Sequence, residues 1–309
     1  MIEKIGHLNI YKSKTLLKGL KFAGENSAVF TSGASLLLAS TLRPIATMLT
    51  PNTPENDKKI SFIKSISSAI SGFLFMLIAS SPFSKAVKKI DNNPSKYLSQ
   101  ETIKNLSNGV DNVSSSKSYK FLTQLFKLGL TFLLAYPKAL TNNVIIPKII
   151  EKSEAKPVSF TSKLENIIAD TINNKTMQNI AKKAQNTNYT THLIALGDIF
   201  STIAFTTITS KNKNLDNHQK KVLNYNALLS TALCLLFGYS ADKISDKSMD
   251  KFIKKLSNVN KKSPDLAKYT EGAKIAKTSL IFGMVYYGLI PMLSTFLSGK
   301  LAQNDNNTL

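Results

Sequence analysis

The chain has 309 residues, and its 40 lysines and arginines against 19 aspartates and glutamates give a formal net charge of +21. The basic residues are spread through every polar stretch instead of gathering with aromatic residues on one face, which argues against a nucleic-acid-binding surface. Cys234 is the only cysteine, so the chain has no disulfide within itself, and we expect a small buried apolar residue there.

The first half opens with a basic N-terminal segment, residues 1–27, without a clear signal-peptide cleavage site. Three apolar segments follow, and we expect each to be a membrane-spanning helix: residues 28–50, 65–84 and 121–141. A bilayer core of roughly 30 Å needs about 20 helical residues, and all three segments reach that length. The second contains no charged residue, whereas Arg43 and Lys127 lie within the first and third.

The second half begins with residues 151–188, which we predict to be an amphipathic linker because Leu164, Ile168 and Ile172 share one helical face. Three more apolar segments are expected to span the membrane: residues 189–210, 222–241 and 278–299. Between the last two, apolar residues at helical spacing alternate with lysines, which predicts a basic amphipathic helix on the membrane surface: Met249, Phe252, Ile253 and Leu256. Residues 301–309 form a polar tail.

These segments predict an all-α, polytopic membrane protein with about six transmembrane helices. Two features indicate that the helices form two diverged three-helix repeats, residues 28–150 and 189–300. The run Lys58-Lys59-Ile60 before the second segment is matched by Lys220-Lys221-Val222 before the fifth. Gly129 and Pro137 in the third segment also have the spacing of Gly283 and Pro291 in the sixth. Basic interfacial helices are expected between the second and third helix of each repeat.

The relative orientation of the two repeats is left open by the sequence. Three crossings per repeat would insert the second repeat upside down, an arrangement common in secondary transporters. An additional crossing near residues 140–150 would instead make the repeats parallel. The distribution of lysines over the predicted loops is nearly even if all six segments cross, so the positive-inside rule gives no orientation.

Charged residues within apolar segments are the candidates for a functional site, since a charge at the centre of a membrane helix costs roughly 2.5–3.5 kcal/mol on insertion scales. We predict that Arg43 pairs with Asp198 between the repeats and lines a substrate or ion pathway, with Lys127 as a further candidate. The alternative for Arg43 and Lys127 is that their side chains reach the membrane surface. Helix breaks are expected at Pro44, Gly129, Pro137, Gly283 and Pro291.

No enzymatic activity, cofactor or metal is predicted. His7, His192 and His218 are too scattered for a metal site. The stretch Gly238-Tyr239-Ser240 begins like a nucleophile elbow, but Asp242 stands where the second glycine belongs.

Two classes of function remain. The first is a permease for a small solute or ion, with its site between the repeats. The second is a non-catalytic membrane scaffold or envelope protein that binds anionic lipid headgroups or a protein partner. The lysine-rich connections between the second and third helix of each repeat distinguish the two classes. If they lie on opposite sides of the membrane they favour the permease, and if they lie on the same side they favour the scaffold. The expected location is the cytoplasmic membrane of a bacterium whose AT-rich genome supplies lysine in place of arginine.

Overall fold

The computed structural model describes residues 10–49, 55–107, 112–140, 161–213, 215–291 and Leu293. Over these residues the chain forms helices and no strand, which confirms the predicted all-α class. Three helical segments are long and apolar enough to cross a membrane: Ser27–Ala46, Tyr189–Lys211 and Lys220–Val259. The other three crossings and the duplication stay predictions. The predicted tail and the region of the additional crossing lie outside the described residues.

The helices of the first half are α2 (Lys14–Glu25), α3 (Ser27–Met48), α4 (Glu55–Asn92), α5 (Pro94–Tyr97), α6 (Gln100–Ser107), the 3₁₀ turn η1 (Val113–Ser115) and α7 (Lys117–Leu140). Those of the second half are α9 (Thr161–Asn173), α10 (Lys175–Ala184), α11 (Tyr189–Lys211), α12 (Asn217–Val259), α13 (Leu266–Met284) and the π-helical segment η3 (Val285–Leu289). α4 has 38 residues and α12 has 43. Each is about twice the length of a membrane crossing and therefore extends well beyond its apolar segment.

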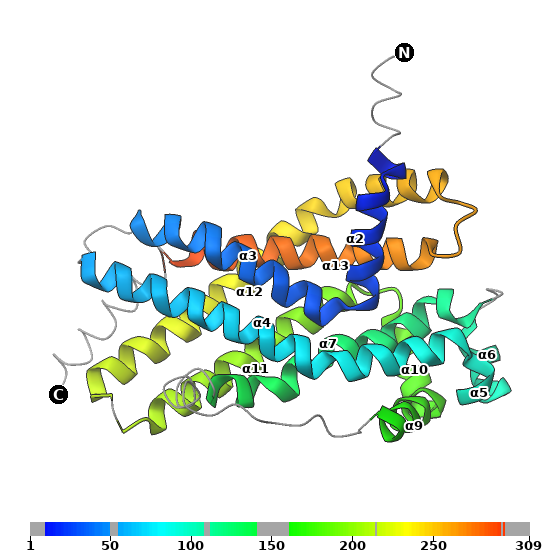
Figure 1. The fold of residues 1–309 in the computed structure, drawn as a ribbon, viewed down its shortest axis with the longest axis horizontal. Coiled ribbons are helices and arrows are strands. Elements are labelled where there is room, and N and C mark those ends of the chain that lie inside the picture. The colour runs from blue at the N-terminus through cyan, green and yellow to red at the C-terminus, as the bar shows by residue number, and fades with distance from the viewer. Residues whose placement is uncertain are drawn as a thin grey trace, which may run out of the picture.

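Side-chain contacts fix the directions of the long helices (Figure 1). α3 and α13 run in the same direction, because Thr31 lies 2.9 Å from Ser279 while Leu42, further along α3, lies against Gly288. α11 and α12 run in opposite directions, because Asn188 at the start of α11 bonds Asp242 whereas Ser210 near its end bonds Asn224. In the same way α3, α7, α11 and α13 run one way, and α4 and α12 run the other.

This pattern places two connections at the same end of the molecule: the one from α4 to α7 and the one from α12 to α13 (Figure 1). The order of directions in α3, α4 and α7 is therefore repeated in α11, α12 and α13. The helices of the two halves thus follow the same order of directions, as the second alternative left open by the sequence requires, while the additional crossing of that alternative lies outside the described residues.

The molecule divides along the helix axes into two parts. We call the first the apolar zone: α3, residues 65–84 of α4, α11, residues 222–241 of α12, residues 278–291 and Leu293. Large apolar side chains are exposed around its outside: Leu37, Ile45, Met48, Leu49, Ile70, Leu74, Leu77, Ile78, Leu196, Phe200, Ile203, Leu228, Leu236, Phe237, Leu280, Met284, Leu289 and Leu293. Helices that expose apolar side chains along such a band are suited to contact with lipid.

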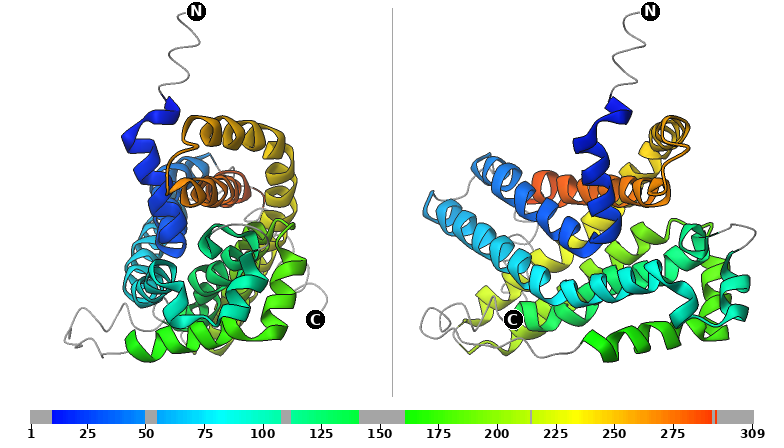
Figure 2. Two further views of the ribbon diagram at one scale, coloured as in Figure 1. Left: turned by 90° about the vertical axis from the view of Figure 1, so that its right-hand side faces the viewer. Right: turned by 45° about the vertical axis from the view of Figure 1, so that its right-hand side comes forward.

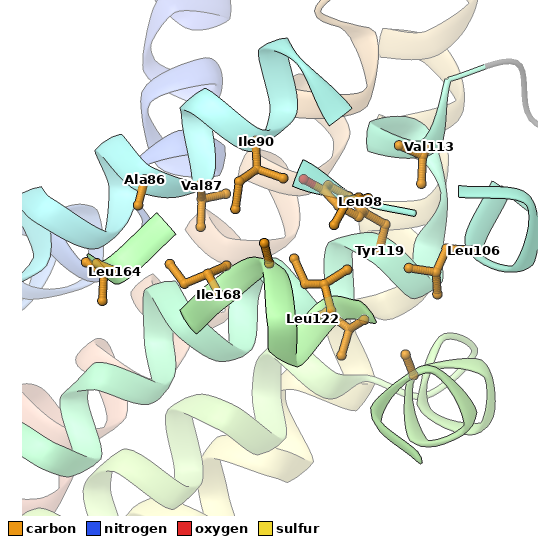
Figure 3. Close-up of a cluster of buried hydrophobic side chains, with 13 residues drawn as sticks. Ala86, Val87, Ile90, Leu98, Leu106, Val113, Tyr119, Leu122, Leu164 and Ile168 are labelled. Atoms are coloured by element: carbon orange, nitrogen blue, oxygen red, sulfur yellow. The ribbon is translucent and has the colours of Figure 1, made fainter. Parts of the chain in front are cut away.

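We call the second part the basic lobe: α2, residues 85–92 of α4, α5, α6, η1, the start of α7, α9, α10, residues 242–259 of α12 and residues 266–277. It has a core of its own, in which α4 and α9 pack against each other and Tyr119 and Leu122 of α7 lie beside them (Figure 3). The Tyr119 hydroxyl donates to Asp91 at 2.7 Å, and Lys89 forms a 2.6 Å ion pair with Glu165. Figure 2 shows α9 and α10 on the side of this lobe opposite α2 and α13.

Both predicted amphipathic segments pack against protein. In the linker, Leu164, Ile168 and Ile172 are buried in the core of the basic lobe. The segment that was expected to lie on the membrane as a separate helix is the continuation of α12. Its Leu256 is fully buried, and its neighbours pack against residues of α2 and α13 such as Leu20 and Ala273. The apolar face that suggested contact with lipid is covered by α2, and the place of this segment at the membrane surface stays a prediction.

α2 crosses α13 at two glycines whose backbones meet. A Cβ atom on Gly24 would lie 2.6 Å from the carbonyl oxygen of Lys268, and one on Gly272 would overlap the carbonyl oxygen of Leu20. These atoms belong to the backbone and cannot turn aside. The absence of a side chain is therefore what allows α2 to lie against α13, where Lys21 of α2 pairs with Asp265 at 2.6 Å and Glu25 of α2 pairs with Lys268 at 2.7 Å.

We predict that Gly272→Ala lowers the free energy of unfolding by about 1–3 kcal/mol or more, since the added methyl group must push α2 away from α13. Gly19→Ala is the matched control, because Gly19 is exposed on α2 with nothing within 4 Å of its Cβ position. That change should be neutral or stabilising by up to about 1 kcal/mol. Thermal unfolding in detergent measures both, and equal effects of the two variants would contradict the packing described.

Candidate functional site

The segment η3 (Val285–Leu289) is the most irregular part of the apolar zone. α13 changes there from α-helical to π-helical hydrogen bonding, and the segment ends two residues before Pro291. A proline has no N–H to donate to the carbonyl four residues earlier, here that of Tyr287, so the regular ladder cannot continue through this point. Single π-helical turns within α-helices frequently occur at functional sites. The segment lies between Gly283 and Pro291, the two positions where the sequence predicted a break in this helix.

Arg43 of α3 and Asp198 of α11 lie around η3. Both side chains are half-buried, and both act electrostatically on the phenols of Tyr286 and Tyr287. Asp198 also acts on the thiol of the buried Cys234 in α12. Arg43 and Asp198, which are far apart in the sequence, thus share one neighbourhood. No direct Arg43–Asp198 bond is described, so their pairing stays a prediction.

The position of Arg43 follows from the way α3 packs on α13. Gly283 leaves room for the side chain of Leu38, which a Cβ atom at that position would overlap. One turn further along, Leu42 lies 3.8 Å from the Cβ position of Gly288. The two glycines thereby place the turn that carries Arg43 beside the two tyrosines.

Further polar side chains lie at the interface between α11 and α12. Thr202 and Thr231 form a hydrogen bond across the interface, and Ser230 donates to Asn226 at 3.2 Å. On the outside of the same stretch of α11, Phe200 and Ile203 are exposed. The apolar zone therefore has polar groups between its helices and apolar groups outside, as expected for helices that pack against one another in lipid.

The remaining residues singled out from the sequence do not join this neighbourhood. Pro44 lies inside α3, which continues to Met48, and α7 is helical through Gly129 and Pro137 up to Leu140. Lys127 is buried at the end of α2, where its ammonium group donates to the Gly24 carbonyl at 3.2 Å. Gln124 donates to the same carbonyl. This carbonyl belongs to the last turn of α2, where a positive charge is favourable, and the side chain does not reach out to the surface.

The sequence did not single out a buried network around Asp242, a residue that is only 2% exposed. One carboxylate oxygen accepts from Asn188 at 2.7 Å and from Thr191 at 2.8 Å. The other accepts from Lys277 at 3.0 Å and from Thr278 at 3.2 Å. The available signal was that Asp242 and Lys277 directly flank the charge-free segments of α12 and α13, where the two helices run side by side in opposite directions.

The described residues contain no group of three or more His, Cys, Asp or Glu side chains that could hold a metal ion. The chain matches no protein-family model, no curated protein and no solved structure. The function must therefore be inferred from the arrangement of charge and apolar surface alone.

We predict that Asp242→Ala lowers the free energy of unfolding by about 3 kcal/mol or more, because it removes the buried carboxylate that pairs with the ammonium group of Lys277. The double variant Asp242→Ala/Lys277→Ala should lose less than the sum of the two single changes, since the residues are in contact. Asp246→Ala is the control: Asp246 also bonds Lys277, at 2.5 Å, but it is 49% exposed, so the cost should stay below about 1 kcal/mol. Chemical unfolding in detergent measures these differences. A control as costly as Asp242→Ala would refute the special role of the buried carboxylate.

Proposed function

We propose that the protein is a non-catalytic membrane scaffold that is embedded through its apolar zone and presents the basic lobe to an anionic membrane surface and to partners there. The proposal is carried by the observation that two lysine-rich connections lie at the same end of the molecule: the one from α4 to α7 and the one from α12 to α13. Because the halves run parallel, the lysines of both connections add up on one side. Inverted halves would have divided them.

The lysines support one-sided charge. Among the described residues, the end of the molecule opposite the basic lobe carries a short set: Lys58, Lys59, Lys64, Lys138, Lys211, Lys213, Lys220 and Lys221. The other described lysines lie in the basic lobe or at its border. On α12 they form an exposed stripe four residues apart: Lys243, Lys247, Lys251 and Lys255. A lysine near an anionic membrane surface contributes about 1 kcal/mol of attraction, so such a stripe favours anionic lipid.

The same asymmetry gives an orientation. Lysines near the ends of membrane helices are retained on the cytoplasmic side. We therefore place the basic lobe in the cytoplasm, against the inner leaflet of a cytoplasmic membrane. The connection from α3 to α4 and that from α11 to α12 then lie on the opposite side.

Labelling of single cysteines in a Cys234→Ala background tests this topology. We predict that cysteines at the exposed positions Lys104 and Asn258 react from the cytoplasmic side, and that a cysteine at the exposed position Lys213 reacts only from the other side. The helix directions require the first two to agree. Labels at Lys104 and Asn258 on opposite sides would refute the scaffold proposal and restore the inverted repeat.

A permease for a small solute or ion is the second candidate, and the neighbourhood of Arg43 and Asp198 around η3 favours it. A π-helical turn with two tyrosines, an arginine and an aspartate inside an apolar zone is an arrangement that could hold a polar solute. Parallel repeats also occur in transporters. The helix directions therefore speak against an inverted repeat, but they do not speak against a permease.

We predict that Arg43→Ala destabilises the protein and that Asp198→Asn in the same chain restores part of the loss, with a coupling of about 0.5–3 kcal/mol. The reason is that removing one charge leaves the other in the apolar zone without its counter-charge. Thermal unfolding in detergent measures the coupling. Arg43→Ala combined with Asp250→Asn is the control, since Asp250 is exposed in the basic lobe, and should give no rescue. Absence of coupling between Arg43 and Asp198 would remove the support for the permease.

A further inference from the structure

A cavity of about 250 Å³ lies where the start of α7 meets α10, α11, α12 and α13. It is lined by Ser115, Lys117, Lys120, Gln185, Tyr189, Ile253, Thr270, Glu271 and Lys274. None of these residues belongs to the neighbourhood around η3. The lining is unusual because three of its side chains are lysines while a single one, Glu271, is acidic.

The cavity lies at the border between the apolar zone and the basic lobe. Tyr189, in its wall, is the first residue of α11, one of the helices long enough to cross a membrane. Two residues further along α11, Thr191 bonds Asp242 at the point where the charge-free segment of α12 ends. In a membrane-embedded protein this border lies at the level of the lipid headgroups, where tyrosine side chains are enriched.

The charges in the cavity are not balanced. Glu271 is buried and already accepts a 2.8 Å hydrogen bond from the Tyr189 hydroxyl. Among the described residues, the Lys120 ammonium group has one hydrogen-bond acceptor, the carbonyl of Ala267 at the long distance of 3.3 Å. Burial lowers the pKa of Lys120, Glu271 acts in the opposite direction, and the nearby charges of Lys274 and Lys117 lower it further. Lys117 and Lys274 are exposed at the rim, so an anion can approach from solvent.

We propose that this cavity is a binding site for a phosphoryl group, held by the ammonium groups of Lys117, Lys120 and Lys274, with the Ser115 hydroxyl as a further donor. Lysine binds phosphate as a point charge, and a phosphoryl group offers several oxygens to amines that converge from different helices. The bound anion would offset the repulsion among the three lysines. The group can come from an anionic lipid or from a soluble phosphorylated molecule. The lipid source rests on the proposed scaffold function, and the site itself does not.

The test uses the full chain, purified in detergent, and three probes: dioctanoyl phosphatidic acid, dioctanoyl phosphatidylcholine and glycerol 1-phosphate. The readout is the dissociation constant from ligand-dependent thermal stabilisation. We expect saturable binding of phosphatidic acid, and the variant Lys117→Gln/Lys274→Gln should weaken it by about tenfold or more. Both lysines are exposed, so the melting temperature without ligand should stay near that of the wild type.

The matched control is Lys182→Gln/Lys183→Gln, which removes the same charge from exposed positions of α10 that do not line the cavity. It should leave the dissociation constant unchanged. Equal weakening by the two double variants, or no saturable binding of any probe, would overturn the site. Phosphatidic acid bound far more tightly than glycerol 1-phosphate identifies a lipid as the source. Equal binding of these two probes also supports the site, but assigns it to a soluble phosphate and removes the lipid anchor from the scaffold proposal.

Discussion

The buried carboxylate of Asp242 is the interaction on which the arrangement of the second half depends. A charge is tolerated away from water only where an opposite charge and hydrogen-bond donors replace the solvent. Asn188 and Thr191 supply donors from the start of α11, and Lys277 and Thr278 supply them from α13. Because all four must meet one side chain of α12, the three helices are aligned lengthwise at this level. The charge-free segments of α12 and α13 meet the network at the same level, so it also marks the border between the apolar zone and the basic lobe.

The two parts on either side of this border use different physical means to hold helices together. In the basic lobe, apolar side chains are buried in a core around Tyr119 and Leu122, as in a water-soluble protein. In the apolar zone, large apolar side chains face outward and the contacts between helices depend on small residues, such as Gly283 against Leu38 and Thr202 against Thr231. Helices in lipid gain little from burying apolar surface against each other, so close packing and hydrogen bonds replace it.

The sequence predicted the all-α class and the apolar segments of α3, α11 and α12 because the length and the mean hydropathy of a segment are local properties. The neighbourhood of Arg43 and Asp198 was also within reach, since a charge in an apolar segment is visible without a structure. Helix directions were not, because the count of crossings depends on residues 141–160, whose segment gives an ambiguous pattern. The surroundings of Lys127 were not predictable for a related reason: its acceptor is a backbone carbonyl, that of Gly24, and the sequence does not show which carbonyl a side chain will reach. The apolar face of α12 around Leu256 suggested contact with lipid, because an apolar face has the same sequence pattern whether it packs against lipid or, as here, against α2.

The position of charge distinguishes the two proposed functions physically. A permease must keep polar groups available to a solute within the apolar zone. Several of the groups found there instead bond one another across helix interfaces, as Thr202 does with Thr231 and Thr31 with Ser279. Such bonds hold helices together and leave fewer donors and acceptors for a solute. In the cavity of Lys117, Lys120 and Lys274 the opposite holds, because positive charge exceeds the acceptors that the protein supplies. Unbalanced charge is thus concentrated at the border and in the basic lobe. These positive charges favour binding to an anionic surface, which is why we rank the scaffold above the permease.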